Sequence, residues 1–156
     1  MTYREYRTVD KSQWKPGPWQ NEPDKIQFKD EDTGLSCLIV RGPVGSLCGY
    51  VGVVENHPLY KQDGDQLECH GGVTFTGFCQ TEADPSHGIC HLPDPGEPDH
   101  VWWFGFDCAH VYDKTPGALY ESSWPHNVYR DIEYVKNEIK KLAKQLKGET
   151  THGEIQ

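Results

Sequence analysis

Three residues of the chain are of types that bind metals or move protons, and their spacing lets them meet. His70 lies near the start of CHGGVTFTGFC (69–79), Asp107 directly follows the apolar run VWWFGF (101–106), and His110 comes three residues later. If a turn or a helix begins after the run, the side chains of Asp107 and His110 converge. Two imidazoles and one carboxylate are a minimal set for a catalytic zinc or other divalent metal with open coordination positions.

The same residues allow two other interpretations. Without a metal, Asp107 would orient His110 in an acid–base pair. In a purely structural arrangement, a buried histidine bonds to the backbone and Asp107 caps the next turn. The catalytic interpretations assign the chemistry to His70, Asp107 and His110, and the spacing alone does not choose among the three.

A second group of candidate metal ligands lies around the loop 80–99, which is rich in proline. Cys79 and Cys90 are expected to lie close enough to share a metal or a disulfide. With His91 and one further ligand they could hold a structural zinc that fixes the loop. The sequence contains no CxxC motif, so cysteines that simply pack in the interior are an equal alternative.

Glycines inside strand-like segments suggest a place where a ligand approaches the backbone. Aromatic side chains near them could stack on a planar ligand. The predicted ligand-binding residues are Tyr50, Gly71, Gly72, Thr74 and Trp103. Bulges and tight aromatic packing are the alternative explanation for the glycines.

The elements that position these residues are predicted to form an α+β fold. Runs of β-branched residues separated by glycine and proline predict antiparallel strands arranged as a meander. These strands cover residues 24–28, 35–41, 47–54, 69–79 and 101–106. The last is apolar on both faces, which is typical of a central strand. Alternation along 69–79 would place His70, Thr74 and Thr76 on one face.

A long amphipathic helix is predicted over residues 128–147, packed on the sheet. Its apolar stripe, with a spacing of three and four residues, consists of Ile132, Val135, Ile139, Leu142 and Leu146. Asn127 is the expected N-cap and Gly148 the expected C′ residue.

The 156 residues are expected to form a single domain, 1–156. It would comprise an extended N-terminal arm (1–23), a sheet region (24–111), the helix and a flexible tail (149–156). A net charge of −9 disfavours general binding to nucleic acid or to anionic membranes. No apolar run reaches membrane-spanning length, and the first residues do not resemble a signal peptide, so a cytoplasmic location is expected. The sequence sets no oligomeric state.

Long segments of the chain resemble a family of small uncharacterised proteins from tailed phages and bacterial prophages. The resemblance is carried by TGLSCLIVRGPVGSLCGYVGV, HPLY, CHGGVTFTGFC, GICHLP, PGEPDHVWWFGFDCAH and YRDIEYVKNEI, and it covers roughly residues 16 to 146. It implies that residues matching His70, Asp107 and His110 are shared, and that residues matching Cys79, Cys90 and His91 tend to be kept. A cysteine matching Cys69 is not implied. The family commonly has HGGLTY where this chain has HGGVTF, a conservative departure.

Three functions are compatible with these observations in the cytoplasm of a phage host. The first is a metal-dependent hydrolase of a small, nucleotide-like substrate, in which Asp107 or Glu97 moves protons. The second is a counter-defence protein that sequesters a small-molecule ligand. The third is a counter-defence protein that blocks a host enzyme. We expect the first, with a small molecule or a host protein as the partner.

Overall fold

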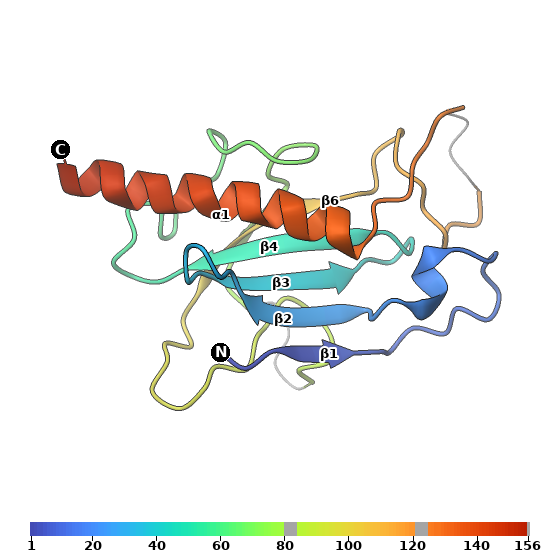
Figure 1. Ribbon diagram of the computed structural model, residues 1–156, viewed down its shortest axis with the longest axis horizontal. Coiled ribbons are helices and arrows are strands. Elements are labelled where there is room, and N and C mark those ends of the chain that lie inside the picture. Colours follow the sequence, from blue (N-terminus) through green and yellow to red (C-terminus); the bar gives the residue numbers. More distant parts are fainter. Residues whose placement is uncertain (80–83, 121–124, 156) are drawn as a thin grey trace.

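Six strands form one antiparallel sheet, and one long helix lies across it in the computed structural model (Figure 1). The strands are β1 (Arg4–Tyr6), β2 (Lys25–Lys29), β3 (Ser36–Arg41), β4 (Leu47–Val53), β5 (Phe75–Gly77) and β6 (Trp102–Asp107), in the spatial order β1-β2-β3-β4-β6-β5. A 3-10 helix, η1 (Pro18–Asn21), precedes β2. The structure describes residues 1–79, 84–120 and 125–155, with side chains as far as Gly148. Residues 80–83, in the predicted loop 80–99, residues 121–124, and residue 156, in the predicted tail, lie outside it.

The helix α1 (Ile132–Ile155) packs on β4 and β3 (Figure 1), and its predicted stripe faces them. Val135, Ile139, Leu142 and Leu146 are fully buried, and Ile132 packs against them. Both predicted ends of the helix are wrong. Asp131 is the N-cap, because its carboxylate accepts a hydrogen bond from the Tyr134 amide at 2.8 Å. The backbone stays helical to Ile155, past Gly148 and through most of the predicted tail.

The sheet has an apolar core on each face. The larger core, under α1, includes Phe104 and Phe106 of β6 together with the stripe of the helix. The smaller core, on the opposite face, consists of Leu38, Tyr50, Val101 and Trp103. Strand β6 lies between β4 and β5 and supplies both cores, so its prediction as an interior strand is confirmed.

The predicted strand over 69–79 is wrong for most of its length. Only Phe75–Gly77 pair with β6. Gly71 and Gly72 have φ values of 70° and 81°, which form a turn and break the alternation of side chains that the prediction used. His70 therefore lies in a turn before β5 rather than in the sheet.

The disulfide between Cys79 and Cys90 fastens the loop beyond β5, with Cα atoms 4.8 Å apart. The predicted proximity of the two cysteines is confirmed, and their sulfurs are bonded to each other rather than available to a metal. Beneath this loop, the buried Lys25 donates from Nζ to the carbonyl oxygen of Cys90 at 2.6 Å and to that of His87 at 3.2 Å. Burial lowers the pKa of Lys25 to about 8.

The N-terminal arm is more regular than predicted. β1 adds an edge strand to β2, and Trp19 of η1 is buried. The arm is held by the buried carboxylate of Asp24, which accepts hydrogen bonds from Arg41 Nε at 2.7 Å and from the amides of Thr8 and Val9. Burial alone would raise the pKa of Asp24, but these bonds and an ion pair with Lys11 outweigh it and lower the pKa to about 2.

Among the described residues, no helix combines the length and the apolar character needed to cross a membrane.

Candidate metal centre

The structure brings His70 and His110 together with Asp113, a residue that the sequence analysis did not select. One ligand atom from each of the three lies within 4.8 Å of the other two. His70 and Asp113 are buried, and the side chain of His110 is 26% exposed. This group could hold a metal ion, and the partly exposed His110 is its member nearest to solvent.

His70 and Asp113 form the tightest pair of the group. His70 Nε2 lies 3.0 Å from Oδ1 and 2.9 Å from Oδ2 of Asp113. On the other side of the imidazole, Nδ1 lies 2.7 Å from the hydroxyl oxygen of Tyr134, at the start of α1. The helix thus orients His70 from behind while its Nε2 faces the carboxylate, which is how a second residue commonly orients a metal-ligating histidine.

Asp113 is the centre of the hydrogen-bond network. Its side chain is 0% exposed and also accepts a hydrogen bond from Arg130 Nε at 2.9 Å and one from the His110 amide at 3.1 Å. The turn is closed by a bond from the Asp113 amide to the His110 carbonyl, and Asp113 forms a parallel bridge with Val128. Three groups, His70, Arg130 and the His110 amide, thus satisfy the buried carboxylate.

Asp107 lies beside the group rather than inside it. Its Oδ1 is 3.5 Å from His110 Nε2, the same nitrogen that is 3.1 Å from the Asp107 carbonyl oxygen. Thr74 donates to Oδ2 of Asp107 at 3.0 Å, and the Ala109 amide donates to Oδ1. The expected contact between Asp107 and His110 is therefore present, whereas Asp113 takes the expected place of Asp107 opposite His70.

The glycine turn lets His110 approach. A β-carbon built on Gly71 would meet the imidazole of His110, whereas one on Gly72 would meet nothing within 4 Å. The rings of His70 and His110 are 5.7 Å apart, and Tyr112 stacks on His110 at 5.5 Å. The predicted meeting of the two histidines on one side of the molecule is confirmed.

Two predicted ligand-binding residues are core residues instead. Tyr50 is 8% exposed and Trp103 is 1% exposed, so neither ring offers an open surface on which a planar ligand could stack. The space at Gly105 is filled by the ring of Tyr50. Tight aromatic packing, the alternative explanation, accounts for this glycine.

The second predicted metal group does not form in this structure. Cys79 and Cys90 are bonded to each other, and the imidazole of His91 packs edge-on against Trp103 at 5.4 Å. Burial lowers the pKa of His91. Glu97, the alternative proton carrier, binds the N-terminal ammonium and Lys29 instead. Lys29 ends β2, at the end of the sheet opposite Asp107.

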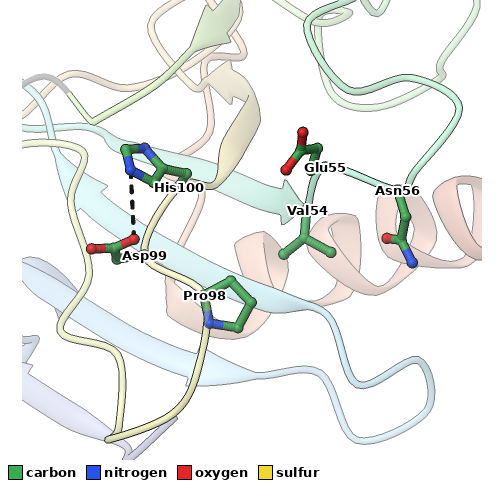
Figure 2. Close-up of a pocket in the computed structure, with 6 residues that line it drawn as sticks. All are labelled: Val54, Glu55, Asn56, Pro98, Asp99 and His100. Carbon is green, nitrogen blue, oxygen red and sulfur yellow. Dashed lines mark ion pairs between the residues drawn. The ribbon is translucent and has the colours of Figure 1, made fainter.

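A surface pocket of about 350 Å³ also lies away from the candidate metal centre. Its lining residues are Val54, Glu55, Asn56, Pro98, Asp99 and His100 (Figure 2). They surround the end of β4 and the start of β6, whereas Asp107 pairs with Cys48 at the other end of the same two strands.

No protein-family model, curated protein or solved structure matches the chain.

Proposed function

We propose that the protein is a small hydrolase that uses a divalent metal, most favourably zinc, held by His70, His110 and Asp113. The observation that carries the proposal is the convergence of one ligand atom from each residue within 4.8 Å, with two of the three residues buried. Two imidazoles and a carboxylate match the donor set that divalent transition metals prefer in open, catalytic sites.

The distances fit such an ion after a small adjustment. Ligands bonded to zinc at about 2.1 Å in a tetrahedron lie about 3.4 Å from one another. His70 Nε2 and the carboxylate of Asp113 are slightly closer than this, at 2.9 Å. The widest pair of ligand atoms lies within 4.8 Å, so it has to close by at most about 1.4 Å. Rotation of the partly exposed His110, which releases its contact with the Asp107 carbonyl, supplies such a movement.

The tautomer of His70 decides whether a metal or a proton occupies the centre. If Nδ1–H donates to the Tyr134 hydroxyl, a lone pair on Nε2 faces the Asp113 carboxylate, and two acceptors then meet at 2.9 Å. A cation between them resolves the conflict. If Tyr134 donates instead, Nε2–H fills the same place. Both tautomers are neutral, so a metal on Nε2 moves the ring proton to Nδ1 without releasing it. Because the ligands of a metal must be deprotonated, zinc binding should still weaken as the pH falls.

When bound, a divalent ion supplies Lewis acidity and lowers the pKa of a neighbouring water. Asp107 would accept the proton of that water, and the hydrogen bonds from Thr74 and the Ala109 amide, which hold its carboxylate beside His110, support this role. The water oxygen bonds to the electrophilic atom of the substrate as the bond to the leaving group breaks. The proton held by Asp107 then passes to the leaving group. The nucleotide-like substrate and the origin in a phage or prophage, which the family resemblance implies, are part of this proposal.

Metal titration and an activity assay test the proposal together. Protein purified without chelator or affinity-tag metal should bind one zinc per chain, and His70→Ala should weaken binding by at least about 100-fold. The matched control is His100→Ala, because that histidine is exposed and lies outside the group. Zinc-loaded wild-type protein should hydrolyse nitrophenyl phosphate esters. His70→Ala should lose this activity, and His100→Ala should keep it. Equal zinc affinity in both variants would refute the assignment of the ligands.

A further inference from the structure

We infer that Arg130 is an oxyanion-binding residue, which receives a phosphoryl group of the substrate beside the candidate metal centre. The inference deepens the proposed function and rests on it for the second contact of the anion, the metal itself. It starts from the way the guanidinium is held.

One edge of the Arg130 guanidinium is committed to the site. Nε donates to Asp113 Oδ1 at 2.9 Å, and the carbon of the guanidinium lies 4.9 Å from the ring centre of Tyr134 and 6.0 Å from that of Tyr112. Two aromatic rings and one charge-assisted bond therefore fix the plane and direction of the group. Arg130 thus offers its remaining donors without a large loss of side-chain freedom on binding.

The other edge has no partner within the described part of the chain. No residue in 1–79, 84–120 or 125–148 accepts a hydrogen bond from Nη1 or Nη2 of Arg130, and the side chain is 21% exposed. For comparison, the buried Arg41 uses its Nη groups on Gly45, Tyr129, Glu22 and Pro23. Within the described residues, the two Nη groups of Arg130 are therefore available as a pair of donors beside the metal ligands.

A phosphoryl group fits this fork better than a neutral ligand does. Parallel N–H donors of a guanidinium match two oxygens of a phosphate, and a neighbouring metal can take a third oxygen. A guanidinium is always charged in proteins, so Arg130 is a cation. In a chain of net charge −9, such a local cation is what attracts an anion to this point of the surface.

The test measures inorganic phosphate and zinc affinities separately, in wild type, Arg130→Gln and the control Lys144→Gln. Lys144 is exposed on α1, so the control removes the same charge away from the centre. We expect Arg130→Gln to weaken phosphate binding by at least about tenfold, whether zinc is present or absent. Its zinc affinity should rise, because a cation beside Asp113 has been removed. The control should leave both affinities within about twofold.

Loss of the anion contact alone should lower the phosphate affinity and raise the zinc affinity. A damaged site would instead lower both affinities. If zinc binds and Arg130→Gln leaves phosphate affinity unchanged, the inference about Arg130 falls and the proposed function stands. If no zinc binds but phosphate still depends on Arg130, the proposed function falls and the anion site stands. Should the variant not fold, side-chain ¹⁵N spectra of wild type decide, because phosphate must shift the guanidinium signals of Arg130. No shift at 10 mM phosphate, on the order of ten times a millimolar Kd, overturns the inference.

Discussion

Replacing Gly71 by alanine should disable the candidate metal centre without touching a ligand. A β-carbon there would lie 2.7 Å from Cε1 and 2.8 Å from Cδ2 of His110, and closer still to Nε2. Ordinary contacts begin near 3.4 Å, so the imidazole must retreat by at least about 0.7 Å. The widest ligand pair, within 4.8 Å, has to close toward about 3.4 Å for zinc, and the new methyl group opposes that movement.

Gly72→Ala is the matched control for this experiment. Both glycines have positive φ, 70° and 81°, so each alanine carries a similar backbone strain of about 1–2 kcal/mol. Only the methyl group at position 71 meets His110, since nothing lies within 4 Å of a β-carbon on Gly72. The difference between the two variants therefore isolates the effect of displacing the imidazole.

Zinc affinity, measured by competition with a chromophoric chelator, is expected to fall at least about 30-fold in Gly71→Ala and less than threefold in Gly72→Ala. Urea unfolding of the zinc-free proteins gives the stability of each variant in parallel. If the two variants bind zinc equally well while both remain folded, His110 is not a ligand, and the three-residue centre is refuted.

Four further changes have expected outcomes. Tyr134→Phe removes the hydroxyl behind His70 and should weaken zinc binding about 10- to 100-fold, which isothermal titration measures; an unchanged affinity would mean that the hydroxyl does not orient the imidazole. Leu142→Ala opens a cavity under α1 and should lower the free energy of unfolding by about 2–5 kcal/mol in urea, whereas a loss below about 1 kcal/mol would contradict its place in the core. Cys90→Ser opens the 11-residue loop of the disulfide and should cost about 3 kcal/mol by the same measurement, with reductant lowering the stability of wild type but not of the variant. Because the folded-state pKa of Asp24, about 2, lies below its usual 3.8, its stabilisation is full above pH 4 and is lost as the pH falls toward 2; Asp24→Asn should flatten this part of the pH–stability curve.

The elements that carry a strong local pattern were predictable. The stripe of α1 repeats over four turns and predicts a helix. The runs LSCLIVR, LCGYVGVV and VWWFGF are rich in β-branched and aromatic residues and predict strands. β1 has no such pattern: Arg4–Tyr6 is short and largely exposed, and it becomes a strand only because β2 offers it an open edge. The failure at 69–79 is local, since two adjacent glycines with positive φ turn a strand-like sequence away from the sheet.

The missed ligand shows where spacing stops being informative. In DCAHVYD, Asp107 and Asp113 each lie three residues from His110, one on either side. Spacing alone therefore does not distinguish the two aspartates, although their backbone positions differ. Asp107 is still the last residue of β6, whereas the turn after it carries Asp113 back under His110. Asp113 is also held by Arg130, which is 17 residues away and gives no signal in the local sequence.

Asp113 connects the fold to the proposed chemistry. Its carboxylate joins the turn of His70, the turn that follows β6 and the segment that enters α1, through His70, the His110 amide and Arg130. A buried carboxylate with this many donors is satisfied without a metal, so the protein can fold before the ion binds. Metal binding then changes the tautomer of His70 and does not have to fold the chain. Binding should therefore add stability only through mass action, about 2.7 kcal/mol at 100 times the Kd, while the geometry of the ligands is set in advance by the hydrogen bonds that the fold already makes.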